Sequence, residues 1–338
     1  MAELLRDSEL KAAQDIALAL QAGLNVRLLG QSELVKMVTV ACLARGHVLL
    51  EGLPGLGKTE LVKGVAGLLG LSFRRVQFTP DLLPGDVTGG PVLEEDDGKR
   101  RFVFHPGPIF GNVVLADEIN RASPRTQSAM LEAMQERRVT VLGETHNLPD
   151  PFWVLATQNP IELEGTFPLP EAQLDRFLFK LNVHRVDTDT LTTLLTERRR
   201  GRPPEPSAVS TAAGLDSLFE AVDRVFLPNA VAGYIARLVN ATHPEEPSAP
   251  AKVRRYARYG ASPRAAIGIA ESARAHALLH GKPNVGFDDV RAVATYALGH
   301  RIVVDYKAKL DGIGGLDLAE EVLAVLDEMA TPMPGEVA

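Results

Sequence analysis

The chain is poor in the features that mark several classes of protein. Of its 338 residues, only Cys42 is a cysteine. No intramolecular disulfide can therefore form, and the composition fits a reducing compartment. The neighbours of Cys42 are apolar, so we interpret it as a small core residue. Aromatic residues make up 5% of the chain, and we find no basic stripe rich in aromatic residues of the kind that binds single-stranded nucleic acid.

Long apolar runs and an excess of positive charge are also missing. No stretch approaches the roughly 20 apolar residues that a membrane helix needs. Acidic residues at positions 3, 7 and 9 make the N-terminus unlike a secretory signal. We therefore expect a cytoplasmic protein without membrane insertion. The net charge of −7 argues against broad, non-specific binding of nucleic acid.

The length and the pattern of the chain predict two domains. We expect an amphipathic helix over residues 1–22 with a turn at Gly23, Leu24 and Asn25, and a second helix from Gln31 to Leu43 capped by Ser32. Strands and helices then alternate, which predicts an α/β core with a parallel sheet and flanking helices. The expected elements are residues 47–51, 59–70, 73–78, 113–117, 124–137, 153–157 and 177–183.

A change in composition predicts the domain boundary. Residues 197–206 are charged and then proline-rich, and such a segment cannot continue a helix. We therefore expect a core over 23–188, a linker over 189–210 and a smaller all-α domain over 211–338. The arginine run at 198–202 is either a phosphate-binding patch or, as is more usual for such runs, a solvated helix end or linker.

Residues 52–59 read Gly-Leu-Pro-Gly-Leu-Gly-Lys-Thr, a complete phosphate-binding loop of the form G-x-x-x-x-G-K-[ST]. Its glycines let backbone N–H groups approach an anion, while Lys58 reaches the β- and γ-phosphates and the Thr59 hydroxyl ligates Mg²⁺. An apolar run precedes the loop and a helical pattern follows it, which aims a helix N-terminus at phosphates. The sequence therefore predicts a nucleoside triphosphate site. Its expected residues here are Gly52, Pro54, Gly55, Leu56, Gly57, Lys58, Thr59 and Glu60.

Two later strands end in polar residues that suit hydrolysis. Residues 113–116 are apolar and lead to Asp117 and Glu118, and a buried strand delivers such acids to the carboxyl edge of the sheet, where α/β proteins bind ligands. We expect Asp117 to hold Mg²⁺ and Glu118 to polarise the attacking water. Asn159 follows another apolar strand and could orient that water or contact the γ-phosphate, although Asn-Pro alone is a common turn former.

The order of these motifs resembles the MoxR group of AAA+ ATPases. The similarity covers residues 46–176 and rests on the phosphate loop together with the stretches 77–84, 116–122, 126–136, 156–162 and 169–177. It continues at 260–264 and, more loosely, at 298–302, whereas residues 1–22 and 195–255 match least. The resemblance implies an AAA+ P-loop NTPase core followed by a smaller all-α lid domain, with ATP and Mg²⁺ as cofactors.

The resemblance also implies roles for single residues. Lys58 and Thr59 match the Walker A motif, Asp117 and Glu118 match Walker B, and Asn159 matches sensor 1.

Three further matches concern the edges of the site. Arg176 matches the arginine finger that such assemblies insert into a neighbouring subunit's site, and Arg264 matches sensor 2 in the lid. Gly30 and Gln31 resemble the segment that lines the adenine pocket through its backbone. Because an arginine finger acts at a neighbour's phosphate, the resemblance implies a homo-oligomeric ring, with a hexamer as the expected form.

Two stretches predict β-hairpins, at residues 89–110 and 139–150. In the first we expect strands near 91–94 and 101–104 joined by a turn at 96–98. They resemble inserts that face the pore or the substrate side of the ring in this clade; the alternative is two surface hairpins with no contact role. His47, His105 and His146 lack partners at metal-ligand spacing, so no zinc site is predicted.

The resemblance implies a chaperone-like ATPase that matures or activates a protein partner, often together with a protein carrying a von Willebrand factor A domain. Two alternatives belong to other classes. A nucleic-acid motor is disfavoured by the acidic charge and the few aromatic residues. A nucleotide switch or scaffold without hydrolysis is disfavoured by Asp117, Glu118 and Asn159, since a pure binder needs no water-activating acid.

Overall fold

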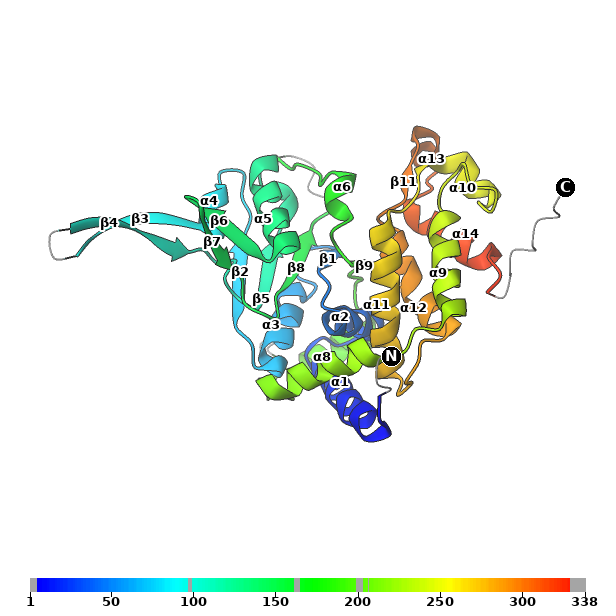
Figure 1. Cartoon of the computed structure of the whole chain (residues 1–338), viewed down its shortest axis with the longest axis horizontal. Helices are drawn as coiled ribbons and strands as arrows, with labels where there is room; N and C mark the ends of the chain where they lie inside the picture. The colour runs from blue at the N-terminus through cyan, green and yellow to red at the C-terminus, as the bar shows by residue number, and fades with distance from the viewer. Residues whose placement is uncertain (1–4, 97–98, 161–164, 199–202, 206, 329–338) are drawn as a thin grey trace. The chain divides into compact units, whose positions relative to one another are not determined.

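The structure, a computed structural model, describes residues 5–96, 99–160, 165–198, 203–205 and 207–328. It divides into two compact units (Figure 1), one of residues 12–220 and one of residues 1–11 with 221–338. The division falls inside two helices, α1 (Asp7–Arg27) and α8 (Ala212–Arg224). The domain boundaries expected from the sequence stay a prediction.

The larger unit is built on a parallel five-stranded sheet of order β2-β5-β8-β1-β9. This arrangement confirms the predicted α/β core. Because the strands are parallel, their carboxyl ends lie at one edge, where loops can gather polar side chains. The strands are β1 (Val48–Glu51), β2 (Phe73–Gln77), β5 (Val113–Asp117), β8 (Trp153–Gln158) and β9 (Phe179–Asn182).

Helices flank this sheet. Side chains that alternate along the strands, among them Leu49, Val114 and Val154, form one buried cluster with Met130 and Met134. Besides the larger parts of α1 and α8, the unit contains α2 (Ser32–Leu43), α3 (Lys58–Leu69), α4 (Pro84–Thr88), α5 (Pro124–Glu136), α6 (Glu171–Leu174) and α7 (Thr188–Glu197), with a 3₁₀ turn at Ile119–Arg121.

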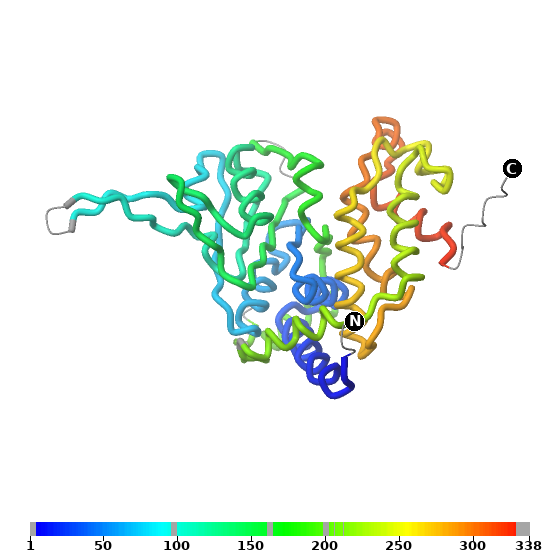
Figure 2. Tube along the Cα trace, in the orientation of Figure 1, coloured from blue at the N-terminus to red at the C-terminus, as the bar shows by residue number. Residues whose placement is uncertain are grey.

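Two antiparallel hairpins interrupt the α/β alternation. β3 (Gly89–Asp96) pairs with β4 (Lys99–Pro106), and β6 (Arg138–Val141) pairs with β7 (Glu144–Asn147). Figures 1 and 2 show the β3–β4 hairpin as a long arm that extends away from the sheet. The expected turn of this arm includes residues 97 and 98, which lie outside the described residues.

The turn predicted at Gly23, Leu24 and Asn25 is wrong, because α1 continues through these residues to Arg27. Leu24 is fully buried. A Cβ atom on Gly23 would lie 2.6 Å from Leu68 Cδ2 of α3. The glycine therefore lets two helices approach closely, and it does not mark a break in the chain.

The stretch expected to be a linker begins as a helix, α7. The Asp187 side chain accepts a hydrogen bond from the Thr190 amide at 2.8 Å and so caps its N-terminus. Beyond α7, the Arg198 side chain donates to the backbone oxygen of Arg27 at 2.7 Å, and burial lowers its pKa. Arg198 therefore binds the C-terminal end of α1. Several residues named in the sequence analysis lie outside the described residues: 199–202 of the arginine run, 206 of the proline-rich part, and 161–162 of the stretch 156–162.

The smaller unit is mainly helical. Its α11 (Pro263–Leu279) and α12 (Phe287–Leu298) pack through buried apolar residues such as Ile269, Val290 and Val293. A short antiparallel pair of strands, β10 (Ala257–Tyr259) and β11 (Val303–Val304), lies among the helices and was not expected. The helices are α9 (Asn229–Asn240), α10 (Ala251–Tyr256), α11 (Pro263–Leu279), α12 (Phe287–Leu298), α13 (Tyr306–Leu310) and α14 (Gly315–Val325).

No helix among the described residues combines the length and the apolar character needed to span a bilayer.

Candidate functional site

The phosphate loop connects β1 to α3. Gly55 and Gly57 have φ angles of 82° and 84°, which side chains other than glycine rarely adopt. Gly52 is required for another reason, since a Cβ atom there would lie 2.7 Å from the backbone oxygen of Val183. The glycine spacing read from the sequence therefore follows from backbone geometry at all three positions.

The N-terminus of α3 faces the loop without a capping side chain, because its N-cap residue is Gly57. Its first N–H groups have no partner within the helix and suit an anion. Lys58 Nζ donates to the backbone oxygen of Gly52 at 2.6 Å. Burial lowers the pKa of Lys58, although Asp117, Glu118 and Glu51 oppose this shift. A cation held in a partly buried, glycine-lined loop is suited to phosphate oxygens.

The loop opens onto a pocket of ≈ 410 Å³. Residues from the loop, from α3 and from the carboxyl ends of β2, β5 and β8 line it. They are Pro54, Gly55, Gly57, Lys58, Thr59, Glu60, Arg75, Gln77, Asp117, Glu118, Thr157 and Asn159.

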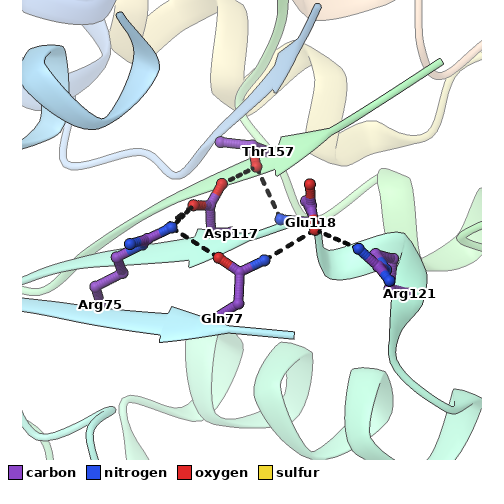
Figure 3. Close-up of polar contacts among 6 residues, drawn as sticks. All are labelled: Arg75, Gln77, Asp117, Glu118, Arg121 and Thr157. Carbon is purple, nitrogen blue, oxygen red and sulfur yellow. Dashed lines mark hydrogen bonds and ion pairs between the residues drawn. The ribbon is translucent and has the colours of Figure 1, made fainter. Parts of the chain in front are cut away.

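Asp117 and Glu118 are positioned by Thr157 on the neighbouring strand. The Thr157 hydroxyl donates to Asp117 Oδ1 at 2.7 Å and accepts from the Glu118 amide at 2.8 Å (Figure 3). Glu118 has a φ angle of 57°, an uncommon conformation for a residue with a side chain. The chain thus turns sharply at the end of β5.

A chain of polar contacts continues from the two acids to β2 (Figure 3). Arg75 donates to Asp117 Oδ2 from Nε at 3.1 Å and from Nη2 at 2.7 Å, and the same Nη2 donates to Gln77 Oε1 at 2.7 Å. The Gln77 amide donates in turn to Glu118 Oε2 at 2.8 Å. Arg121 Nη1 reaches that same oxygen at 3.0 Å. Each acid is therefore held from more than one side.

Arg75, Gln77 and Thr157 were not predicted as site residues. The sequence did contain a relevant pattern. Arg75 and Gln77 are two residues apart on β2, so their side chains lie on the same side of that strand. Thr157 lies in the stretch 156–162, which contributes to the family resemblance, but no role was predicted for it. Their partners depend on which strands are neighbours, and in this sheet β5 lies between β2 and β8.

The other predicted residues are spread more widely. Asn159 is buried and lines the pocket, whereas Leu56 and Gly52 are not among its lining residues. Arg176 follows α6 and does not line the pocket either; its Nε is buried and has no hydrogen-bond partner in the described part of the chain. Arg264 is an exposed residue at the start of α11, in the smaller unit.

The segment at Gly30 and Gln31 is held by the chain after β9. The buried Gln31 side chain donates to the backbone oxygen of His184. Gly30 has a φ angle of 70°, and a Cβ atom there would lie 2.8 Å from the Thr190 hydroxyl oxygen. Its predicted role at adenine stays a prediction.

A hydroxyl and a carboxylate from Thr59 and Asp117 line the same pocket, and hard oxygen donors of this kind fit Mg²⁺. The three histidines considered from the sequence have other surroundings. His47 bonds with the backbone of Met134 and Val154, His105 with Glu94 at 2.7 Å, and His146 stacks on Phe104.

Comparison with known proteins gives consistent matches over both parts of the chain. Residues 47–179 match the ATPase family associated with various cellular activities (AAA), and residues 250–322 match the AAA lid domain. Chaperone MoxR1 of Mycobacterium tuberculosis is 43% identical over 286 residues, which cover 85% of this chain and 75% of that protein. The uncharacterized protein YeaC of Bacillus subtilis is 42% identical over 305 residues, or 90% and 92% of the two chains.

A solved structure is similar over nearly the whole chain. It is the crystal structure of a protein from Cytophaga hutchinsonii proposed to be an ATPase, with 34% identity and a TM-score of 0.86, and the match covers 95% of this chain and 97% of that one.

Proposed function

The chain belongs to the MoxR family of AAA+ ATPases, and from this membership we propose that it hydrolyses ATP to remodel, mature or activate a protein partner. A relative that is 43% identical is named a chaperone, which supports a protein client. We also propose that a protein with a von Willebrand factor A domain takes part and that the protein works in the cytoplasm.

The observation that supports hydrolysis over simple binding is the single pocket shared by the phosphate loop, Asp117, Glu118 and Asn159. A binding site alone needs the loop, but it does not need a second acid beside the one suited to the metal. Glu118 is in addition held in an uncommon backbone conformation, of the kind that recurs at functional sites.

In the proposed mechanism, Lys58 and the N–H groups of the loop bind the phosphates, and Thr59 and Asp117 are the residues that would hold Mg²⁺. When bound there, the ion would neutralise charge on the phosphate oxygens. Glu118 accepts a hydrogen bond from the attacking water and orients it in line with the bond that breaks. Asn159 contacts the same water or the γ-phosphate.

Arg176 has no place in the lining of this pocket, and we propose that it acts at the site of a neighbouring subunit. A planar guanidinium with a permanent charge suits the spread charge of the transferring phosphoryl group. A finger supplied in trans is worth about 10³–10⁵ in rate. This role requires a homo-oligomeric ring, for which a hexamer is our proposal, and we assign Arg264 to the lid side of the nucleotide.

The test is ATP turnover with Mg²⁺ by the purified protein and by Glu118→Gln. We expect the variant to bind ATP and to lose turnover, because a neutral amide polarises the attacking water far less than a carboxylate does. Glu144→Gln, at an exposed glutamate of β7, is the matched control and should keep full turnover. The proposal fails if the wild type shows no turnover above Glu118→Gln.

A mixing experiment tests action between subunits. Lys58→Ala should lose nucleotide binding, and Arg176→Ala should keep binding while turnover collapses. In mixed rings, some interfaces combine an intact loop from one subunit with an intact arginine from its neighbour, so turnover should return. No recovery on mixing two folded, associating variants would count against Arg176 as a finger.

A further inference from the structure

Arg75 forms an ion pair at 2.7 Å with Asp117, the acid that is proposed to hold the metal. It contacts one oxygen of Asp117, Oδ2, through both Nε and Nη2 at 3.1 and 2.7 Å, and Figure 3 shows the guanidinium beside that carboxylate. The other oxygen, Oδ1, accepts the Thr157 hydroxyl at 2.7 Å. Both oxygens of Asp117 therefore already have donors from the chain itself.

A divalent cation at Asp117 needs a lone pair of the same carboxylate. It would also place two positive charges close to the guanidinium of Arg75. An arginine stays charged at any ordinary pH, so the repulsion cannot be relieved by loss of a proton. Arg75 must move away, or the metal must bind more weakly.

The position of Arg75 allows such a movement. Its side chain is 50% exposed, whereas that of Asp117 is 15% exposed. Solvent can therefore take up the released guanidinium at little cost, while the acid stays in place, held by Thr157. A single ion pair with one half-exposed partner contributes little to folding stability, so its effect on the metal is the larger expected consequence.

We propose that Arg75 is a displaceable counter-ion of Asp117 that competes with Mg²⁺ and sets the metal concentration at which the site binds nucleotide tightly. This inference rests on the proposed function of Asp117 as a metal ligand. Arg75 is a positioning residue in this account, since it acts on the acid and not on the substrate.

The direct test is nucleotide binding at controlled free Mg²⁺. The affinity for a fluorescent ADP analogue is measured from a chelator-buffered, metal-free solution up to saturating Mg²⁺, and the midpoint of the metal dependence is compared between variants. Removal of one charge near the ion in a water-like dielectric should lower this midpoint roughly tenfold in Arg75→Gln. Arg75→Lys, which keeps the charge but loses the two-nitrogen contact, should fall between Arg75→Gln and the wild type.

Two controls separate a local effect from a general one. Arg74 is exposed and precedes Arg75 on β2, so its side chain lies on the opposite side of the strand. Arg74→Gln removes the same charge and should leave the midpoint unchanged. In an Asp117→Asn background, Arg75→Gln should no longer shift the midpoint, because the acid through which Arg75 acts is gone.

The outcomes also separate this inference from the proposed function. A midpoint that is unchanged or raised in a folded Arg75→Gln protein overturns the role of Arg75. An equal shift in Arg74→Gln overturns it too, because the effect would then be one of net charge. If the wild type shows no Mg²⁺ dependence, or binds no nucleotide, the function of the pocket itself fails, and that result is visible without any variant.

Discussion

The hydroxyl of Thr157 donates a hydrogen bond of 2.7 Å to the carboxylate of Asp117 across the neighbouring strands β8 and β5. The same oxygen accepts the amide of Glu118 at 2.8 Å. One hydroxyl thus links the acid proposed to hold the metal to the backbone of the acid proposed to activate water. Thr157 is 1% exposed, so this link lies away from bulk water.

Replacement of Thr157 by valine keeps the shape of the side chain and removes this link. We expect Thr157→Val to lower the free energy of unfolding by about 1–3 kcal/mol, because a buried amide and a carboxylate oxygen lose their partner. Loss of one such contact in the transition state would lower kcat about tenfold. Urea unfolding and ATP turnover measure the two effects. Thr140→Val on the exposed face of β6 is the control, and an equal loss of turnover there would contradict the assignment.

The Gln77 side chain links Arg75 to Glu118. It accepts a hydrogen bond from Arg75 and donates one to Glu118 at 2.8 Å. We expect Gln77→Leu to bind nucleotide with nearly unchanged affinity and to lose about tenfold in kcat, the effect of one misplaced hydrogen bond. Separate measurements of nucleotide affinity and of single-turnover hydrolysis distinguish these effects. If affinity falls and the single-turnover rate stays, Gln77 contacts the nucleotide and does not orient Glu118.

The sequence predicts the loop and the acids, but it does not predict the contacts between them. Gly52, Gly57, Lys58 and Thr59 lie within one short stretch of the chain, and their spacing alone predicts a phosphate loop. Arg75 and Asp117 are 42 residues apart, and they meet only because β2 pairs with β5 in a register that sets Gln77 opposite Asp117. Strand order and register are properties of the folded sheet, and no local pattern encodes them.

The role of Gly23 also could not be predicted from the local sequence. Gly23 was expected to lie in a turn after the first helix. Its actual function is to admit Leu68 at close range, which only the packing of α1 on α3 reveals. The sequence shows that a glycine is present at position 23, but only the tertiary contact with Leu68 shows why a side chain there would be unfavourable.

His47 gives a pH dependence that can be measured. Burial lowers its pKa from 6.5 to about 4; the hydrogen bond to Met134 opposes this shift, and the charge of Arg137 adds to it. The unfolded chain therefore binds a proton at His47 below pH 6.5, while the folded chain does so only below about pH 4. The contribution of neutral His47 to stability is complete above pH 6.5 and is lost as the pH falls toward 4, to a total of about 3 kcal/mol.

The measurement is the free energy of unfolding in urea between pH 7 and pH 4.5. His47→Gln has no titrating group at this position, so its stability should fall less steeply than that of the wild type over this range. An NMR titration of the His47 ring should show its midpoint near 4. Parallel pH profiles for the two proteins, or a midpoint near the ordinary value, would contradict the burial argument.

A comparison of Gly57 with Gly143 distinguishes the effect of backbone strain from that of a steric clash. Its φ angle is 84°, and a Cβ atom there would lie 2.6 Å from Leu28 Cδ1. Gly143, in the turn between β6 and β7, has a φ angle of 86° with nothing within 4 Å of such an atom. Both alanine variants should pay about 1 kcal/mol for the left-handed backbone. Only Gly57→Ala should also displace the loop, and we expect its nucleotide affinity to fall at least tenfold while that of Gly143→Ala is unchanged.

The Leu28 contact can be relieved. Because Leu28 meets the added carbon with the end of a flexible side chain, Leu28→Ala in the Gly57→Ala background should restore part of the nucleotide affinity. Leu28→Ala alone should cost stability by leaving a cavity but should bind nucleotide normally. Titration of a fluorescent nucleotide into the four proteins gives the coupling between the two sites. If the double variant binds no better than Gly57→Ala, the loss arises from the backbone conformation of the loop and not from Leu28.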